Sequence, residues 1–217
     1  MSTPAHRARL VLRLRGQGIT DTNVLAAIER VPRDMFVPDA FRDQAWEDMA
    51  LPIGHGQTLS QPYVVARMAE ALELEPRHKV LEIGTGSGYH AAVLAQLCRR
   101  VYTIERHRPL LVEAERRFKA LRLYNITALV GDGMKGWPQQ APFDRISVTA
   151  AAAEPPPALL EQLAPDGIMI MPVGGRDGAQ ELVRFRHGAD GIVVAEPLLA
   201  VRFVPLLPGV AQGSATG

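Results

Sequence analysis

The sequence has little of what marks a secreted, metal-binding or disulfide-stabilised protein. Cys98 is the only cysteine among 217 residues, so no internal disulfide can form, and its apolar surroundings predict a buried helix face in a reducing compartment. The six histidines are scattered without the spacing of metal ligands. No segment approaches the roughly 20 apolar residues that span a bilayer, and residues 1–18 lack the apolar core and cleavage site of a secretory signal. These absences favour a soluble, cytoplasmic protein with no metal and no membrane partner.

An excess of charge of one sign is also missing. The 24 basic residues almost balance the 23 acidic ones, which leaves a formal net charge of +1. A protein that binds duplex nucleic acid usually shows a strong basic excess, so we expect no nucleic-acid partner. The arginine-rich residues 7–15 are interpreted as a packed helix with a solvated basic face, and contact with a membrane or RNA is the alternative.

The length and composition fit one globular unit. Hydrophobic residues at 47% and charged residues at 22% are ordinary for a folded domain and exclude the signature of disorder. We expect a monomer with three parts: N-terminal helices with a substrate-site loop over residues 1–60, a core over residues 61–207 and a flexible tail over residues 208–217.

The first part of the chain reads as helices followed by a long loop. A second helix should run from a cap at Asp21 to residue 30, where Val-Pro ends it. Residues 35–59 show no sustained period and contain recurring proline and glycine, yet their aromatic and apolar content predicts a packed, functional loop. A helix is predicted over residues 61–74, with Ser60 as its N-cap and Pro62 near its first turn.

The rest of the chain alternates between short β-rich runs and helical stretches. The predicted strands cover residues 79–83, 100–105, 126–130, 143–149 and 167–173. The predicted helices between them cover residues 89–99, 109–121 and 157–163. This rhythm predicts an α/β fold with a doubly wound, mostly parallel, Rossmann-like sheet. Runs at 181–186 and 192–197, followed by 201–206, predict a C-terminal hairpin that extends one edge of the sheet.

A glycine-rich turn follows the first predicted strand of the sheet. Gly84, Gly86 and Gly88 form a G-x-G-x-G pattern between a strand and a helix, where open α/β sheets bind ligands. The turn alone is a weak signal, because tight turns need glycine whatever they hold. Glu105 ends the next strand, about 20 residues further on, where a carboxylate can accept hydrogen bonds from ribose hydroxyls.

The spacing and charge of the turn favour S-adenosylmethionine over a dinucleotide. Glu82 stands just before the first glycine, where it would repel a pyrophosphate and attract the ammonium and sulfonium groups of S-adenosylmethionine, directly or through water. After the third strand, Asp132 could accept the adenine amino group, and its glycine neighbours would let the ring approach the backbone. Surface acids and an ordinary Gly-Asp-Gly turn are the structural alternatives, and a nicotinamide dehydrogenase is the functional one.

Longer segments resemble the protein-L-isoaspartate O-methyltransferases, which act on damaged aspartyl sites in proteins. The most specific are ALPIGHGQTLSQP at residues 50–62 and VLEIGTGSGY at residues 80–89. Supporting segments lie at residues 131–133, 141–151 and 201–206. Many methyltransferases share the glycine turn, so residues 54–62 carry the assignment.

The resemblance implies a class I methyltransferase fold and a reaction. A methyl group would pass from S-adenosylmethionine to the free carboxylate of L-isoaspartyl, and possibly D-aspartyl, residues in damaged proteins. A carboxylate is already ionised at neutral pH, so neither a general base nor a metal is required and catalysis should rest on proximity and orientation. A small-molecule or other macromolecular acceptor, and a cofactor-binding regulatory module without catalysis, are the alternatives.

The resemblance also carries roles onto individual residues. It implies that Ser60 is the active-site residue and orients the acceptor carboxylate, with helix capping as the structural alternative. His55 and Arg202 are implied to face the substrate. The implied cofactor residues are Thr58, Leu59, Gln61, Gly84, Glu105, Asp132 and Gly133.

The sequence departs from the pattern of the family in three places. His90 replaces a frequent glutamine, Met134 and Lys135 follow Gly-Asp-Gly in place of an aromatic residue, and Leu207 stands where some relatives carry threonine. These departures bear on affinity and fine specificity and leave the reaction type unchanged.

Overall fold

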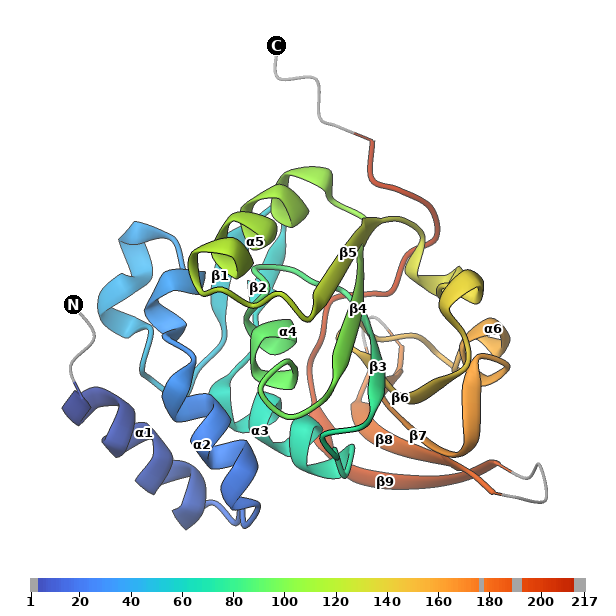
Figure 1. Cartoon of the computed structure of the whole chain (residues 1–217), viewed down its shortest axis with the longest axis horizontal. Helices are drawn as coiled ribbons and strands as arrows, with labels where there is room; N and C mark the ends of the chain where they lie inside the picture. Colours follow the sequence, from blue (N-terminus) through green and yellow to red (C-terminus); the bar gives the residue numbers. More distant parts are fainter. Residues whose placement is uncertain (1–3, 176–177, 189–192, 213–217) are drawn as a thin grey trace.

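The computed structural model describes residues 4–175, 178–188 and 193–212 and begins with two packed helices, α1 (Pro4–Gly16) and α2 (Thr22–Arg30) (Figure 1). The predicted cap of α2 is confirmed: the Asp21 carboxylate accepts the backbone N–H groups of Asn23 at 2.8 Å and Val24 at 3.2 Å. No helix in the described part of the chain is both long and apolar enough to cross a membrane.

Residues 35–59 are more ordered than predicted. Two 3₁₀ helices, η1 (Arg33–Phe36) and η2 (Asp39–Gln44), lead into an antiparallel hairpin of β1 (Leu51–Gly54) and β2 (Gln57–Leu59). The prediction of a loop without regular structure is therefore wrong. The strands have only four and three residues, too few for a period to be visible.

A seven-stranded sheet forms the centre of the molecule, in the order β5-β4-β3-β6-β7-β8-β9. Its strands are β3 (Lys79–Ile83), β4 (Arg100–Glu105), β5 (Ile126–Val130), β6 (Phe143–Val148), β7 (Leu163–Gly174), β8 (Gln180–His187) and β9 (Val193–Val201). The pairs from β5 to β7 are parallel, and β8 and β9 are antiparallel. The predicted fold class and edge hairpin are confirmed. The strand order reverses between β3 and β6, which is the position where such sheets bind ligands.

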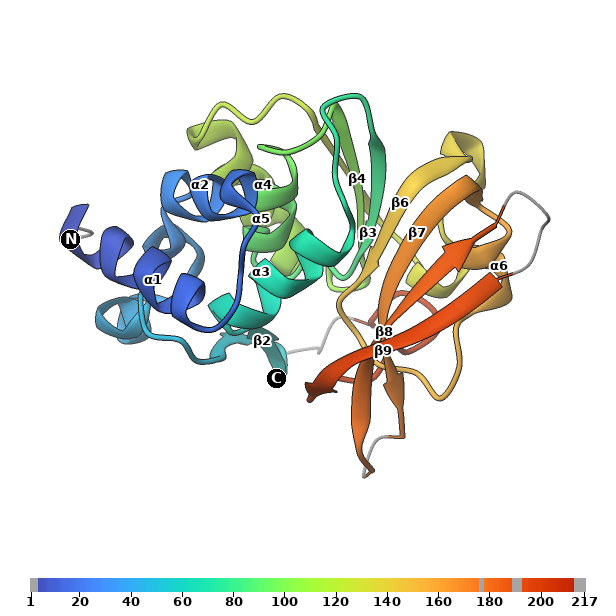
Figure 2. The same ribbon diagram turned by 90° about the horizontal axis from the view of Figure 1, so that it is seen from below.

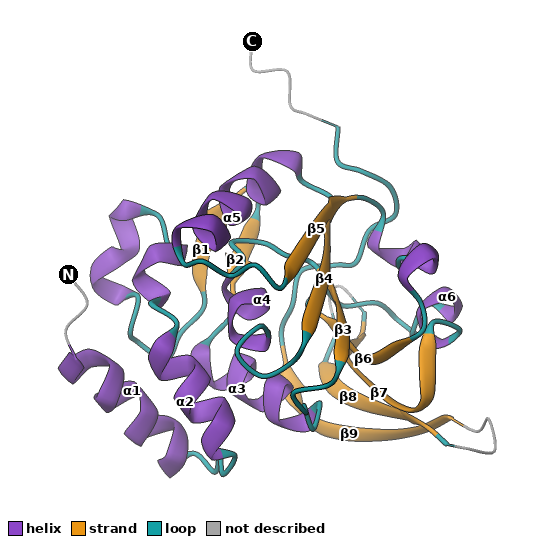
Figure 3. Cartoon of the chain, viewed as in Figure 1, coloured by secondary structure: helices purple, strands orange, loops and turns teal. Residues whose placement is uncertain are grey.

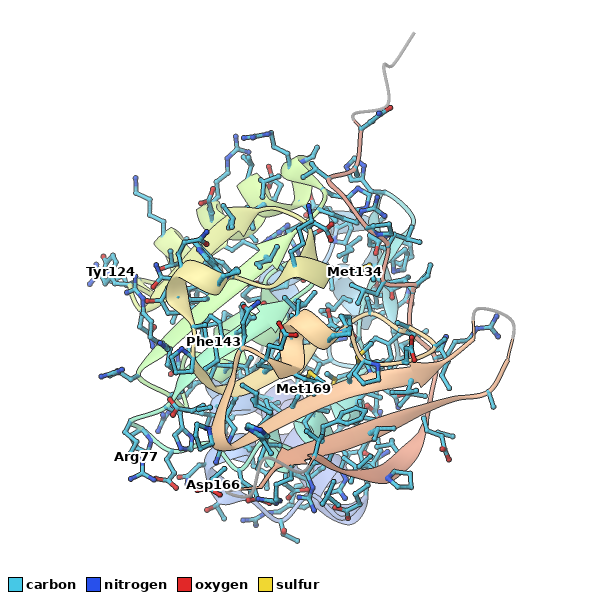
Figure 4. All side chains as sticks on the ribbon, turned by 90° about the vertical axis from the view of Figure 1, so that its right-hand side faces the viewer. Arg77, Tyr124, Met134, Phe143, Asp166 and Met169 are labelled. Atoms are coloured by element: carbon cyan, nitrogen blue, oxygen red, sulfur yellow. The ribbon has the colours of Figure 1, made fainter. Side chains whose placement is uncertain are left out.

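The helices α3 (Pro62–Ala71), α4 (Tyr89–Leu94) and α5 (Arg108–Ala120) join α1 and α2 on one side of the sheet, and α6 (Pro157–Leu160) lies on the other (Figures 2 and 3). Alternate residues of β3 face opposite sides of the sheet. Val80 packs in the hydrophobic core that contains the N-terminal helices, and Leu81 packs in a second hydrophobic core that includes Leu159 of α6. Phe143 and Met169 belong to this second core (Figure 4). One apolar cluster thus joins residues 1–60 to the sheet.

The helices α4 and α6 end earlier than predicted. The Asn125 side chain donates hydrogen bonds to the carbonyls of Ala95 at 2.8 Å and Cys98 at 3.3 Å, which holds the residues after α4 in turns. Cys98 is buried as predicted but lies beyond the end of α4 and not on a helix face, and burial raises the pKa of its thiol to about 12.

The C-terminal segment crosses the carboxyl ends of the central strands without forming the predicted strand over residues 201–206. Instead, Leu206 donates its N–H to the Ala151 carbonyl at 2.7 Å, and Pro205 makes only an isolated bridge to Ala151. Ala211 donates its N–H to the Arg106 carbonyl at 3.0 Å, which ties one point of the described residues 208–212 to the core, and the flexible tail over residues 208–217 stays a prediction. The rest of that tail and most of the predicted turn between β8 and β9 lie outside the described residues.

Candidate active site

A cleft opens at the carboxyl ends of the central parallel strands. The empty space in the cleft, counted together with the open solvent at its mouth, is about 840 Å³. Residues after β3, β4, β5 and β6 line it, as does the C-terminal segment over residues 203–207. Gln57, Thr58, Leu59 and Ser60 close it from the β1–β2 side. The cleft therefore joins segments that are far apart in the sequence.

The glycine turn needs glycine for two different reasons. Gly84, Gly86 and Gly88 all have positive φ, at 93°, 53° and 92°. A Cβ atom on Gly84 would lie 2.3 Å from Oγ1 of Thr149, and one on Gly88 would lie 2.7 Å from the Phe118 ring. Gly84 and Gly86 line the cleft as predicted. Gly88 does not line it, and its position is explained by the packing of α4 against α5.

Glu105 anchors the glycine turn and faces the cleft. Its Oε2 accepts the N–H of Gly86 at 2.8 Å, and its Oε1 accepts the N–H of His107 at 2.9 Å. Each carboxylate oxygen has a second lone pair, so the group can still accept hydrogen bonds from a ligand. The acidic residue therefore lies where a ribose-binding carboxylate was predicted, with its orientation set by two backbone donors.

Glu82 is placed differently from the prediction. Its side chain is fully buried and does not belong to the described lining of the cleft. Oε2 accepts a hydrogen bond from Thr103 Oγ1 at 2.5 Å, and Thr103 Oγ1 lies 2.6 Å from Thr85 Oγ1 in the turn. Burial raises the pKa of Glu82 to about 8, so the carboxyl group is mainly neutral at pH 7. Contrary to the prediction, Glu82 therefore does not attract a charged cofactor directly. It is linked through Thr103 to Thr85 in the glycine turn.

The Gly-Asp-Gly turn brings its second glycine to the cleft. Gly133 lines the cleft, and a Cβ atom there would lie 2.3 Å from Cγ2 of Ile83. Asp132 is half-buried and starts a 3₁₀ turn by accepting the N–H of Met134 at 3.0 Å. Asp132 is outside the described lining, so the structure places Gly133 at the cleft and Asp132 next to it.

Ser60 lies between β2 and α3 and does not cap the helix. Gln61 is the N-cap residue and has no side-chain cap bond, whereas the Asp48 carboxylate accepts the N–H of Tyr63 at 2.9 Å. The predicted capping role of Ser60 is therefore wrong. Ser60 is half-buried, and it lines the cleft.

A second cavity adjoins the cleft. It is lined by Ala50, Thr58, Ser60, Gln61, Val64, Ala200, Val201, Arg202 and Phe203. Thr58, Ser60 and Phe203 line both cavities and form the wall between them. Gln61, predicted to bind the cofactor, lines only the second cavity, which the exposed Arg202 also lines. Ser60 and Arg202 thus line the same cavity, and their roles toward the substrate stay predictions.

His55 is exposed at the tip of the β1–β2 hairpin with a positive φ of 53°. It lines neither cavity in the described structure, so its predicted contact with substrate is not supported. Its ring centroid lies 5.5 Å from that of His107, whose pKa is lowered by burial.

Thr149 lines the cleft and was not among the predicted site residues. Thr149 follows β6. Its Oγ1 lies 3.0 Å from the Ile83 carbonyl oxygen and 2.8 Å from the Gly84 carbonyl oxygen, and the two carbonyls share its one hydroxyl proton. The end of the predicted strand at residue 149 could have indicated it, because parallel strands end at one edge of a sheet. His90 lines the cleft although only 7% exposed, and burial lowers its pKa to about 4, so the ring is neutral at pH 7. Leu207 also lines the cleft.

The described residues contain no group of three or more His, Cys, Asp or Glu side chains arranged to hold a metal ion. The polar side chains that line the cleft are instead hydroxyls, the Glu105 carboxylate, the Gln57 amide, the His90 ring and the Arg106 guanidinium, which can bond an organic ligand with hydroxyl and amino groups.

Comparisons with known proteins agree with this geometry. The model of the family described as Protein-L-isoaspartate(D-aspartate) O-methyltransferase (PCMT) matches residues 5–211. A protein-L-isoaspartate O-methyltransferase of Rhodospirillum centenum is 61% identical over 97% of this chain and 96% of its own. The enzyme of that name from Rhodospirillum rubrum is 59% identical over the full length of both.

Solved structures give the same result. One protein-L-isoaspartate O-methyltransferase superposes with a TM-score of 0.83 at 29% identity, covering 92% of this chain and 65% of that longer chain. A crystal structure from Plasmodium falciparum, described as a beta-aspartate methyltransferase (PCMT) in complex with S-adenosyl-L-homocysteine, gives a TM-score of 0.79 at 25% identity. It covers 93% of this chain and 98% of that one.

Proposed function

Because this chain belongs to the protein-L-isoaspartate(D-aspartate) O-methyltransferase family, we propose that its two cavities divide one methyl transfer between them. The enzyme transfers a methyl group from S-adenosylmethionine to the carboxylate of isoaspartyl residues, which initiates protein repair. In our proposal the cleft holds the cofactor and the second cavity holds the damaged residue. The observation that carries it is that Ser60 lines both cavities.

The lining of the cleft fits S-adenosylmethionine. Gly84 and Gly133 line the cleft, and a Cβ atom on either would collide with Thr149 or Ile83, so these turns pack closely only with glycine at both positions. Glu105 offers carboxylate oxygens to the ribose hydroxyls, and Ile83 and Ile104 offer an apolar surface to the adenine. When bound, the cofactor supplies an electrophilic methyl group on its sulfonium.

The second cavity would orient the acceptor. The isoaspartyl carboxylate is ionised at neutral pH, so no group on the protein has to remove a proton. In this proposal the Ser60 hydroxyl donates a hydrogen bond to one carboxylate oxygen and directs the other toward the cleft. Holding the reacting atoms about 3–3.5 Å apart in the right orientation can lower a reaction barrier by about 7–11 kcal/mol. Arg202 would attract the chain that carries the acceptor.

Two peptides of one sequence, with isoaspartate or aspartate at the same site, test this proposal. The wild-type enzyme should methylate the first and leave the second unlabelled. Ser60→Ala should lower kcat roughly 10- to 100-fold on the isoaspartyl peptide, while its Kd for S-adenosylhomocysteine stays within about twofold. An unchanged kcat in Ser60→Ala would refute the role of Ser60, and equal labelling of both peptides would refute the acceptor.

We also propose that the enzyme acts as a cytoplasmic monomer on isoaspartyl proteins and peptides, without nucleic acid. This is supported by the formation of both cavities from one chain and by the near balance of charge, at +1. Light scattering of the purified enzyme at assay concentration should give the mass of one chain.

A further inference from the structure

Arg33 is a fully buried arginine that contacts both the Ser60 segment and Tyr89 of the cleft. Its Nη2 donates hydrogen bonds to the carbonyls of Ser60 at 2.8 Å and Met49 at 3.3 Å. Its Cζ lies 4.8 Å from the centroid of the Tyr89 ring, and Tyr89 opens α4 and lines the cleft. One guanidinium therefore contacts the Ser60 segment, the chain entering β1, and the helix after the glycine turn.

This arrangement is costly for a residue that only fills space. Arg33 is 0% exposed, and its Nε and Nη1 have no hydrogen-bond partner among the described residues. Burying a cation without a complete set of partners is unfavourable, and an apolar side chain of similar volume often stabilises a protein in such a place. Packing alone therefore does not account for an arginine here.

The bond to Ser60 completes a set of constraints on this residue. Leu59 is held by its pairing with Leu51 in the hairpin. Pro62 restricts the preceding Gln61 to extended backbone, with φ of −52° and ψ of 137°. The direction of the Ser60 carbonyl is left to be set, and Arg33 sets it. Fixing that peptide plane fixes the direction in which the Ser60 side chain leaves the backbone.

We propose that Arg33 is a positioning residue for methyl transfer, whose guanidinium holds the Ser60 carbonyl so that the Ser60 hydroxyl faces the acceptor. This inference rests on the proposed role of Ser60. It concerns the geometry of the acceptor side, so cofactor affinity is not expected to depend on it strongly.

A second arginine ties the same 3₁₀ helix to the cofactor side. Arg117 in α5 donates from Nε to the Met35 carbonyl at 2.8 Å and from Nη1 to the Ser87 carbonyl in the glycine turn at 3.2 Å. Phe36 packs edge-on against Tyr89, with ring centroids 5.5 Å apart. The helix η1 is therefore linked to Ser60 through Arg33 and to the glycine turn through Arg117.

Arg33→Met tests the inference, because methionine is unbranched, apolar and close in length. We expect kcat on the isoaspartyl peptide to fall roughly 10- to 100-fold, as for a displacement of about 1 Å in the site. The Kd for S-adenosylhomocysteine should change by less than about threefold. Arg33→Lys keeps the charge and an N–H donor on a shorter arm and should restore part of kcat.

Arg145→Met is the matched control. Arg145 is 9% exposed and also donates to main-chain carbonyls, those of Leu72 and Glu73, at the other end of α3. Its loss should lower the melting temperature but leave kcat per folded molecule within about twofold of the wild type. If Arg33→Met behaves in the same way, the role of Arg33 is structural and the inference is wrong.

A double-mutant cycle separates this inference from the role of Ser60. If Arg33 acts through Ser60, Arg33→Met should have little further effect on kcat in a Ser60→Ala background. A full and independent effect in that background would overturn the inference. An unchanged kcat in Ser60→Ala alone would instead refute the proposed function. If Arg33→Met does not fold, the same cycle with Arg33→Lys decides the question.

Discussion

The Asp48 carboxylate accepts the backbone N–H of Tyr63 at 2.9 Å, so the side-chain cap at the start of α3 comes from a residue that precedes the hairpin. Ser60, which lies closer in sequence and has a residue type that favours capping, does not make this bond. Because Asp48 supplies the helix cap, the Ser60 hydroxyl is not used for capping, and Ser60 lines both cavities.

This relationship predicts opposite behaviour for two alanine variants. Asp48→Ala should lower the free energy of unfolding by about 1 kcal/mol, because a helix N–H loses its acceptor. Ser60→Ala should leave stability within about 0.5 kcal/mol of the wild type and lower kcat. Urea denaturation of both variants, next to the assay, measures this. A larger loss of stability in Ser60→Ala than in Asp48→Ala would mean that Ser60 is the cap.

Glu105 should control cofactor affinity. Glu105→Ala removes the acceptor for Gly86 N–H and the carboxylate proposed for the ribose, so the Kd for S-adenosylhomocysteine should rise at least about 10-fold. Isothermal titration calorimetry measures this. Glu115→Ala is the control, since Glu115 is exposed on α5 and lies outside the described lining of the cleft, and the Kd of this variant should stay at the wild-type value.

Gly88 should matter for stability through packing. Alanine there adds a Cβ atom 2.7 Å from the Phe118 ring at a φ of 92°, so Gly88→Ala should cost roughly 2–4 kcal/mol. Gly54 has a similar φ of 94° but no neighbour within 4 Å of the added atom, so Gly54→Ala isolates the backbone cost of about 1 kcal/mol. Equal losses in thermal denaturation would show that the contact with Phe118 is unimportant.

Glu82 should make stability depend on pH. Burial raises its folded pKa from 4.5 to about 8, so between these values the folded protein holds a proton that the unfolded chain has released. The contribution of Glu82 to stability is therefore present below pH 4.5 and is lost as the pH rises toward 8. Glu82→Gln removes this titration. The free energy of unfolding of the variant, measured by urea denaturation, should therefore rise relative to that of the wild type between pH 5 and pH 8. A stability difference that is equal at both pH values would show that the carboxyl is already ionised.

Arg202 should affect the acceptor and not the cofactor. It is exposed at the second cavity, so Arg202→Gln should raise KM for the isoaspartyl peptide roughly 3- to 10-fold. The KM for S-adenosylmethionine should not change. Arg77→Gln is the control, because Arg77 lies at the edge of the molecule with its side chain 78% exposed, paired with Glu75 (Figure 4). A rise in KM for both substrates in Arg202→Gln would place Arg202 at the wall between the cavities.

Much of the fold follows from local patterns in the sequence. The alternation of β-rich and helical runs predicted the parallel sheet. Gly84 and Glu105 were identified at the cleft because Gly84 follows one strand and Glu105 ends the next strand at the same edge of the sheet. The hairpin at residues 51–59 was not predicted, because strands of three or four residues are too short to show a hydrophobic period. Its specific sequence was visible only as a family resemblance.

By itself, the sequence determined the α/β class and the cofactor turn, since these depend on steric rules and spacing along one stretch of chain, whereas the segment around Ser60 was identified through the family resemblance. Only the tertiary structure decided which side chains face the cleft. Glu82 lies on a strand buried on both faces, so its residue type could not say that it points beneath the turn. Asp48 reaches Tyr63, and Arg33 reaches Ser60, across 15 and 27 residues of chain. Such contacts arise from packing between elements and leave no periodic trace in the sequence.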